Sequence, residues 1–345
     1  MGENGLTPGA RFFSPAAGGI ACGLCPRRCV IPPGGAGSCR VRVNRRGRGE
    51  LPFYGYVTAL AEDPIEKKPL YHFRPGSTIL SAGFAGCNLR CPFCQNWHIS
   101  QTTETGGAFI APAELIRRAS SSIAYTYSEP LVHIEYLLEC MKEARKMGLA
   151  NVLVTNGCIE AGPAEELLSL TDAANIDLKC FSAETYREVL GGNLDRVLGF
   201  IRMAAAMAVH IEITTLVVPG LNDRPEELDE CAGFIAALPA ERAQGTGTAP
   251  PWHLSAYHPD WRWKAPPTPP ELLLETTRRA REKLPYVYTG NLPGESNDSA
   301  CPYCGAVLVR RRGFRTVYEK LAPREGERGK EYYCGGCGRT ADFIP

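Results

Sequence analysis

Apolar residues along this chain follow two alternating patterns, and the alternation predicts the fold class. From Ser77 onward, short runs of β-branched and aliphatic residues, typical of buried strands, alternate with stretches whose apolar residues recur every three or four positions, typical of amphipathic helices. Strands are predicted at 78–81, 122–127, 151–155, 174–178, 210–218 and 252–256, and helices at 112–121, 131–147, 163–170, 183–207, 225–238 and 271–283. Such repeated units predict an α/β fold with a parallel sheet covered by helices. Six units suit a barrel or partial barrel, where ligands bind at the carboxyl ends of the strands.

Changes in composition divide the chain into five segments. Residues 1–19 are rich in Gly, Ala and Pro and are expected to be disordered. Residues 20–76 hold four cysteines and a turn-rich lead-in, and residues 77–291 carry the strand–helix units. A polar linker at 292–300 precedes a β-rich module with four cysteines at 301–345. The sequence therefore predicts one large α/β domain with a cysteine-rich segment on either side.

Polar motifs follow the predicted strands. They are Tyr127-Ser128-Glu129-Pro130, Thr155-Asn156-Gly157, Asp177-Leu178-Lys179, residues 219–223 and residues 253–258. Any single one is explained as a helix cap, because Ser and Asn are good capping residues. All of them at the same edge of one parallel sheet are not explained by capping. Their placement predicts a ligand site.

Fifteen cysteines are many for 345 residues, and their spacings are those of metal sites rather than of disulfides. Eleven of them form three groups, which are Cys22, Cys25, Cys29 and Cys39; Cys87, Cys91 and Cys94; and Cys301, Cys304, Cys334 and Cys337. The other four, Cys140, Cys158, Cys180 and Cys231, lie in predicted helices or strands and are interpreted as small buried hydrophobic residues.

The central group, Cys87, Cys91 and Cys94, has the spacing C-x3-C-x2-C, with Phe93 just before the last cysteine. Three thiolates on one short loop can hold three irons of a [4Fe-4S] cluster. No fourth cysteine lies nearby in the sequence, so one iron keeps an open position, which is typical of a catalytic rather than a structural metal. The alternative is a zinc knuckle or a loop of buried cysteines, but knuckles usually use C-x2-C pairs.

The first group of four cysteines lies among Gly and Pro residues, so a metal is the expected organiser of this segment. Tetrathiolate Zn²⁺ and a second Fe-S cluster both fit the spacing. Eight arginines and no acidic residue occur between Asn4 and Gly49. These arginines suit contacts with RNA phosphates or with an acidic partner, or they offset the negative charge of the thiolates; we favour the charge offset.

The last group consists of two C-x2-C-G motifs, which are typical of a tetrahedral tetrathiolate site, most often zinc with a structural role. A rubredoxin-like iron site that relays electrons is the alternative. Arg310, Arg311, Arg312 and Arg315 make the module basic, so a nucleic-acid-binding ribbon is a further interpretation.

Charge and hydropathy exclude some classes of protein. The net charge of +1 favours no particular partner. No apolar run approaches the length of about 20 residues that spans a bilayer, and no signal peptide opens the chain, so we expect a cytoplasmic protein without a membrane partner.

The order C-x3-C-x-aromatic-C after an apolar strand is the signature of radical S-adenosylmethionine (AdoMet) enzymes, and this chain resembles them from Cys22 to Cys337. It looks most like the AmmeMemoRadiSam branch, which is similar to pyruvate formate-lyase activating enzymes. The resemblance also rests on residues 124–130, 155–157, 176–179, 215–223, 251–253 and 288–291, and on the final C-P-x-C-G. It implies a partial (β/α)6 barrel with a zinc-ribbon-like module at its end.

The resemblance also implies the cofactors and their contacts. AdoMet would chelate the fourth iron, and Phe93 would lie beside its adenine. Ser128 and Glu129 stand where many of these enzymes have Gly-Gly-Glu, whose backbone holds the AdoMet amino group. Asn156, Asp177 and Lys179 would meet its carboxylate and ribose, and His253 would face the adenosyl end.

Three functions are compatible with these features. The first is an enzyme that receives one electron from ferredoxin or flavodoxin, cleaves AdoMet to a 5′-deoxyadenosyl radical and takes hydrogen from an unidentified small molecule, protein or RNA. The second is an activase that places a glycyl radical on a partner enzyme. The third is a non-catalytic metal-binding interaction protein or nucleic-acid-binding protein, which would not need the polar motifs at the strand ends.

Overall fold

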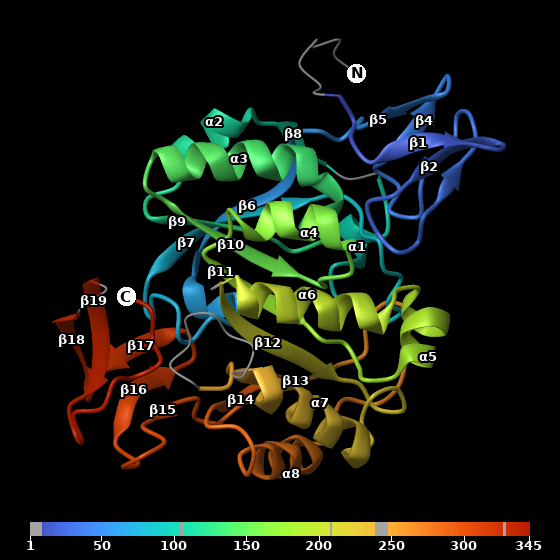
Figure 1. Cartoon of the computed structure of the whole chain (residues 1–345). Helices are drawn as coiled ribbons and strands as arrows, with labels where there is room; N and C mark the ends of the chain where they lie inside the picture. Colours follow the sequence, from blue (N-terminus) through green and yellow to red (C-terminus); the bar gives the residue numbers. More distant parts are fainter. Residues whose placement is uncertain (1–8, 104–105, 208, 239–247, 327–328) are drawn as a thin grey trace.

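The computed structural model of the chain describes residues 9–103, 106–207, 209–238, 248–326 and 329–345. A nine-stranded sheet forms its centre, in the order β14-β13-β12-β11-β10-β9-β7-β6-β8 (Figure 1). Adjacent strands from β7 to β14 are parallel. They are β7 (Thr78–Phe84), β9 (Ser122–Thr126), β10 (Ala150–Thr155), β11 (Ala173–Asp177), β12 (His210–Val217), β13 (Trp252–Ala256) and β14 (Val287–Gly290). The predicted α/β fold is confirmed, and β14 is an additional strand.

Helices connect the parallel strands, as the apolar periodicity predicts. They are α2 (Pro112–Arg117), α3 (Ile134–Lys146), α4 (Ala161–Leu168), α6 (Leu194–Ala206), α7 (Pro225–Ala237) and α8 (Pro270–Ala280). In Figure 1, α3, α4 and α6 lie side by side over the sheet. Shorter helical turns are η1 (Ile65–Lys67), α1 (Trp97–Ser100), η2 (Pro130–His133), α5 (Ala183–Thr185) and the π-helical η3 (Tyr186–Leu190).

The helices predicted within 183–207 are separated by a break at Gly191 and Gly192. Gly191 adopts a φ of +69°, a left-handed conformation that ends η3. Asn193 then caps α6, because its side-chain oxygen accepts a hydrogen bond from the backbone N–H of Arg196. Gly191, its neighbour Gly192 and the Asn193 cap together explain why residues 183–207 form two helical segments.

The core lies between the sheet and its helices. Leu153, Ile176 and Ile213, on three neighbouring parallel strands, have no solvent exposure. Because parallel strands are covered on both faces, their residues are apolar almost without interruption. Burying one such side chain contributes about 1.5–3 kcal/mol.

The lead-in before the cysteine triad, which the sequence predicts to be rich in turns, contains a long strand. It forms the nine-residue strand β6 (Tyr56–Pro64), which pairs antiparallel with β7 and with β8 (Ala108–Phe109). Asp63 on β6 is buried and forms ion pairs with Lys67 and Lys68 at 2.8 and 2.7 Å. Cross-strand pairing and these ion pairs outweigh the local turn signals of Pro and Gly.

The expectation that residues 1–19 are disordered is corrected for the strand β1 (Phe13–Ala16); residues 1–8 lie outside the described residues. This strand pairs with β2 (Gly19–Cys22), and the Arg42 guanidinium lies over the Phe13 ring at 4.8 Å. Tertiary contacts therefore order a segment whose composition alone favours disorder. The N-terminal segment continues with β3 (Val30–Ile31), β4 (Val43–Arg45) and β5 (Arg48–Glu50).

The C-terminal module lies on the opposite side of the sheet from the N-terminal segment (Figure 1). Its strands are β15 (Ser299–Ala300), β16 (Val307–Arg312), β17 (Arg315–Tyr318), β18 (Leu321–Gly326) and β19 (Gly329–Cys334). It attaches near the start of β7, where Phe73 forms a bridge with Ile344. The N-terminal segment instead meets the carboxyl ends of the strands, where Glu160 after β10 donates its backbone N–H to Leu24.

No helix among the described residues is both long and apolar enough to cross a membrane.

Candidate active-site cavity and metal centres

A cavity of about 350 Å³ lies at the carboxyl ends of the parallel strands. Nine of the ten residues expected from the sequence to form the central site line it: Cys87, Cys91, Phe93, Cys94, Ser128, Glu129, Asn156, Asp177 and Lys179. They follow four different strands, β7, β9, β10 and β11. The parallel sheet therefore gathers in one cavity side chains that are up to 92 positions apart, from Cys87 to Lys179.

The cysteine triad follows directly from β7. Gly86, just before it, has a φ of +85°, and a Cβ there would lie 2.4 Å from the carbonyl oxygen of Cys39, so glycine is required. The backbone N–H of Leu89 donates to the Cys87 sulfur at 3.3 Å. Burial raises the pKa of the Cys91 thiol to about 12. Because burial disfavours the charged thiolates, a bound metal is needed to stabilise them. The position of the three cysteines on one wall of the cavity fits a [4Fe-4S] cluster with an open iron.

The backbone after β9 takes a conformation that usually requires glycine. Tyr127 has a φ of +68°, and its hydroxyl donates to Asp63 at 2.5 Å. The Lys68 ammonium lies 4.3 Å from the centre of the Tyr127 ring. These anchors hold the Tyr127 backbone in a left-handed conformation that glycine adopts more readily. The neighbouring Ser128 Oγ is buried without a hydrogen-bond partner among the described residues and belongs to the cavity lining, so it is available to a ligand.

Glu129 is buried and organises the cavity wall. Its carboxylate accepts hydrogen bonds from the Thr155 hydroxyl at 2.6 Å, the Asn156 N–H at 2.9 Å and the Leu131 N–H at 3.1 Å. Burial raises the pKa of Glu129 to about 7, although these hydrogen bonds oppose the rise. Leu131 follows β9, whereas Thr155 and Asn156 lie at the end of β10. Glu129 therefore connects the ends of these two strands.

Asn156, Asp177 and Lys179 present polar groups to the same cavity. The Asn156 amide donates to Asn88 Oδ1 at 3.0 Å and lies 3.7 Å from the Cys87 sulfur. Lys179 Nζ forms an ion pair with Asp177 Oδ2 at 2.8 Å, and both side chains are partly exposed, at 19% and 28%. Thus the cavity offers a cation, a carboxylate and an amide beside the triad.

His253 is the one predicted cofactor contact that the structure does not bring to this cavity. Its side chain is 4% exposed, and its Nε2 lies 2.7 Å from Glu212 Oε2. It points to the same face of β13 as Ser255, which does line the cavity, but stands two residues nearer the amino end. Ser255 and Asn291 also line the cavity, although the sequence analysis did not name them as cofactor contacts. The alternation along β13 and the end of β14 are the signals that identify them.

The first four cysteines, Cys22, Cys25, Cys29 and Cys39, line a second, narrow cavity in the N-terminal segment. Arg42 and Asn88 also line it. Arg42 is 1% exposed and forms a two-point ion pair with Glu135, at 2.8 and 3.0 Å. The structure thus brings the four expected ligands together around one space.

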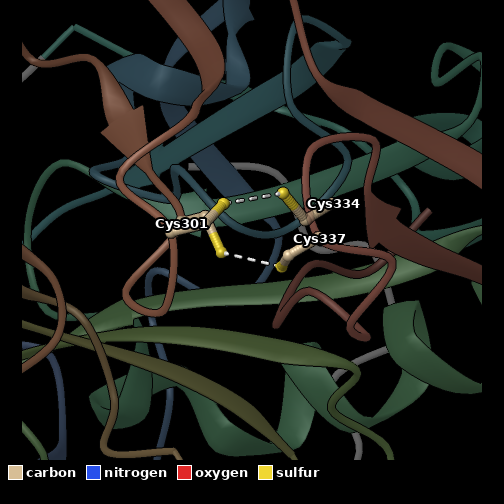
Figure 2. A group of neighbouring side chains, drawn as sticks. Cys301, Cys334 and Cys337 are labelled. Carbon is tan, nitrogen blue, oxygen red and sulfur yellow. Dashed lines mark hydrogen bonds between the residues drawn. The ribbon is translucent and has the colours of Figure 1, made fainter.

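The last four cysteines form a tighter group (Figure 2). The sulfurs of Cys301 and Cys337 are 3.8 Å apart, and those of Cys304 and Cys334 are 3.6 Å apart. All four lie within 4.8 Å of one another. Sulfurs at tetrahedral corners around one zinc ion stand about 3.8 Å apart, given Zn–S bonds of about 2.3 Å. The group therefore has the dimensions of a site for a single metal ion.

The remaining cysteines, Cys140, Cys158, Cys180 and Cys231, are buried, in agreement with the prediction for small core residues.

Comparison with known proteins agrees with this arrangement. The family model described as Radical SAM superfamily matches residues 83–232. An uncharacterized protein of Methanocaldococcus jannaschii is 38% identical over 334 residues, which cover 94% of this chain and 96% of that protein. The pyruvate formate-lyase-activating enzyme of Clostridium pasteurianum is 26% identical over 165 residues, covering 44% of this chain and 67% of that enzyme. The pyruvate formate-lyase 1-activating enzyme of Escherichia coli K12 is 28% identical over 164 residues, covering 44% and 65%.

Two solved structures are also similar to parts of the chain. A domain of a pyruvate-formate lyase-activating enzyme from Bacteroides vulgatus matches with a TM-score of 0.42 and 20% identity, covering 50% of this chain and 100% of that one. A radical SAM methyltransferase from Sphaerobacter thermophilus matches with a TM-score of 0.48 and 14% identity, covering 63% and 67%.

Proposed function

We propose that this chain, which belongs to the radical SAM superfamily, cleaves AdoMet reductively and uses the resulting radical to take hydrogen from a substrate. The observation that carries the proposal is the single cavity that contains the triad, Ser128, Asn156, Asp177 and Lys179. When bound to the triad, the cluster supplies one electron to AdoMet, whose S–C5′ bond breaks to give methionine and a 5′-deoxyadenosyl radical. The protein supplies binding, orientation and exclusion of water.

We assign the chain's own residues as follows. Lys179 holds the AdoMet carboxylate by charge, and Asp177 accepts hydrogen bonds from the ribose hydroxyls. The unpartnered Ser128 hydroxyl and the neighbouring backbone hold the amino group, and Glu129 keeps that backbone and Asn156 in place through its three hydrogen bonds. Phe93 is 3% exposed at the cavity and provides an apolar surface for the adenine.

The identity of the substrate does not follow from the relatives. Activity as a glycyl-radical activase is the second candidate, supported by similarity to pyruvate formate-lyase activating enzymes. That similarity covers 44% of this chain. We therefore propose hydrogen abstraction as the reaction, with a small molecule, a protein or RNA as the substrate class and ferredoxin or flavodoxin as the reductant.

We further propose that the parallel strands form a partial (β/α)6 barrel and that the C-terminal cysteines hold structural Zn²⁺. Sulfur separations of 3.8 and 3.6 Å support a single tetrahedral ion. A rubredoxin-like iron would have similar dimensions, and analysis of the bound metal distinguishes the two.

Formation of 5′-deoxyadenosine tests the proposed reaction. Anaerobically reconstituted protein is reduced with dithionite and incubated with AdoMet, beside the variants Cys91→Ala and Cys231→Ala. Cys231 is a buried cysteine outside the three groups and is the matched control. We expect product from the wild type and from Cys231→Ala only. Wild-type protein that carries a full [4Fe-4S] cluster but neither binds AdoMet nor forms product would overturn the proposal and favour a non-catalytic role.

A further inference from the structure

The four N-terminal cysteines differ in spacing from the C-terminal four. Among the described residues, one group of three or more cysteines has all of its sulfurs within 4.8 Å of one another. It consists of Cys301, Cys304, Cys334 and Cys337. The N-terminal cysteines line one cavity and the triad cysteines line another. Neither set contains three sulfurs that lie this close together. Ligands of one ion must crowd around it, whereas each thiolate of a [4Fe-4S] cluster binds a different iron. The N-terminal arrangement, which lacks such a compact group of three sulfurs, therefore fits a cluster better than one zinc ion.

Hydrogen-bond donors surround this second cavity. The backbone N–H of Ser38 donates to the Cys29 sulfur at 3.4 Å, and the Ser38 hydroxyl lies at the same distance. Arg42, which is 1% exposed, lines the cavity, and its Nε is buried without a partner among the described residues. The Glu135 carboxylate fixes the other end of the Arg42 guanidinium. An unsatisfied buried N–H at such a cavity suits hydrogen bonding to the sulfur atoms of a cluster, which tunes its potential.

The cavity lies between the protein surface and the triad. On the inner side, Asn88 lines it and also accepts hydrogen bonds from Asn156 at 3.0 Å and from the Cys87 thiol at 4.0 Å. On the outer side, Arg27, Cys29 and Ser38 line both this cavity and an open surface pocket of about 580 Å³.

The surface pocket is basic. Arg27, Arg90 and Arg187 line it, and no acidic residue is among its lining residues in the described part of the chain. The Arg187 side chain is 66% exposed and forms an ion pair with Glu188 at 2.7 Å, whereas Arg27 and Arg90 donate to the backbone carbonyls of Gly191 and Glu188. A pocket with this charge favours an acidic partner, because complementary charge speeds and orients encounter.

We propose that Cys22, Cys25, Cys29 and Cys39 hold a second [4Fe-4S] cluster, which receives single electrons from an acidic one-electron carrier protein docked at this basic pocket. Each transfer oxidises the carrier by one electron and reduces the cluster by one, and no bond forms or breaks. Asn88, which lines this cavity and is adjacent to Cys87 in the sequence, lies between the two sites. The inference deepens the proposed function and rests on it for its purpose, but the cluster itself is tested separately.

Metal analysis tests the cluster. The triple variant Cys87→Ala, Cys91→Ala, Cys94→Ala, purified anaerobically and reconstituted, keeps the N-terminal ligands. We expect it to retain about four irons and four sulfides per chain and to show a cluster signal in electron paramagnetic resonance after reduction. Adding Cys22→Ala and Cys25→Ala to the triple variant should remove the iron, the sulfide and the resonance signal. A triple variant that binds a second zinc and no sulfide overturns the proposal. These readouts need no AdoMet, so they stand whether or not AdoMet is cleaved.

Reduction kinetics test the entry point. Arg187→Glu is compared with wild type and with Arg145→Glu, a charge reversal on the exposed side of α3. We expect reduction by an acidic flavodoxin at low salt to slow on the order of tenfold in Arg187→Glu alone. Reduction by photoreduced deazaflavin, a small uncharged donor, stays unchanged in all three proteins. Equal flavodoxin rates in wild type and Arg187→Glu would contradict docking at the pocket.

Discussion

The carboxylate of Glu212 on β12 accepts a hydrogen bond from the ring of His253 on β13, with 2.7 Å between Oε2 and Nε2. Its other oxygen lies 3.1 Å from His210 Nε2 and accepts from the backbone N–H of His72 at 2.8 Å. Burial alone raises the pKa of Glu212, but the hydrogen bonds from His210 and His253 outweigh this and hold it well below its usual range. A buried, ionised carboxylate with three donors thus supports the layer beneath the cavity.

This environment predicts that His253 stabilises the protein rather than contacting AdoMet. His253→Ala leaves part of a buried charge without its donor, which costs about 1.5–3 kcal/mol. We expect a lower melting temperature in thermal unfolding but an AdoMet dissociation constant within about twofold of wild type. His253→Gln, which keeps an N–H donor, should restore part of the stability. A large loss of AdoMet affinity in a well-folded His253→Gln protein would instead support a direct cofactor contact.

Lys179 and Asp177 are expected to act as a unit in binding AdoMet. Lys179→Met removes the cation proposed to hold the carboxylate, and it also leaves Asp177 without its partner at 2.8 Å. We expect AdoMet affinity to fall on the order of tenfold to a hundredfold in equilibrium dialysis. Because the residues share one ion pair, the effects of Lys179→Met and Asp177→Asn should not add in the double variant.

The matched control for this pair is Lys146→Met. Lys146 forms an ion pair with Glu143 at 2.6 Å on α3, with 69% of its side chain exposed. Such surface pairs contribute little to stability, so this variant should bind AdoMet normally. Equal affinities for Lys179→Met and Lys146→Met would remove Lys179 from the proposed contacts.

Loss of the metal proposed for the C-terminal cysteines is expected to weaken the attachment of the C-terminal module. Arg311 on β16 is 2% exposed and donates to the Tyr71 carbonyl at 2.6 Å and to the Ser299 hydroxyl at 2.7 Å. Cys304→Ser should reduce zinc from about one ion per chain to a small fraction, because four thiolates define the site. Iron at the triad should stay unchanged.

Elemental analysis and limited proteolysis measure these two effects. We expect the chain to be cut between the α/β domain and the module faster in Cys304→Ser than in wild type, since bound metal stabilises the folded module. A wild-type module that contains iron with rubredoxin-type absorption, and no zinc, would contradict the zinc assignment.

Sequence patterns identified most of the sheet because its strands are buried on both faces. The run 210–218 is apolar or β-branched almost throughout, and it forms β12 (His210–Val217). In contrast, β14 (Val287–Gly290) was missed, since it is four residues long and is defined by pairing with β13. Its pairing partner, not its own composition, makes it a strand.

Residues that line the cavity could be predicted where a polar residue ends a strand. How far below the cavity a residue within a strand lies was harder to predict. Asn156 and Asp177 lie at strand ends, and both line the cavity. His253 and Ser255 share one face of β13, but two residues along a strand correspond to about 6.6 Å, which separates the cavity from the layer beneath it. Periodicity gives the face of a strand, whereas depth depends on the register with neighbouring strands. That register places His253 outside the residues that line the cavity.

His72 links the α/β domain to the C-terminal module through a directional hydrogen-bond chain. Its Nδ1 donates to the Asp342 carbonyl at 2.6 Å, and its Nε2 accepts from the Tyr288 hydroxyl at 2.7 Å. The Tyr288 hydroxyl in turn lies 2.5 Å from Ser299 Oγ, which accepts from Arg311. A neutral imidazole fits this chain, because one ring nitrogen must donate and the other must accept.

Protonation of His72 is therefore expected to destabilise the folded protein. Burial lowers its pKa to about 3, with smaller opposing effects from Glu212 and further lowering by Arg311 and His210, whereas the unfolded chain has the ordinary value of 6.5. Between these values the unfolded state binds more protons, so stability is complete above pH 6.5 and declines as the pH falls toward 3. One such group contributes a loss of about 1.4 kcal/mol per pH unit.

Urea unfolding from pH 7 to pH 4 measures this dependence in wild type, His72→Gln and His98→Gln. Gln keeps a donor and an acceptor but takes up no proton, so His72→Gln should be less stable than wild type at pH 7 and should lose less stability on acidification. His98 is exposed on α1 and serves as the control, with a pH profile parallel to that of wild type. Parallel profiles for wild type and His72→Gln would show that His72 carries no proton-linked stability, and the acid sensitivity would then have to come from another buried group.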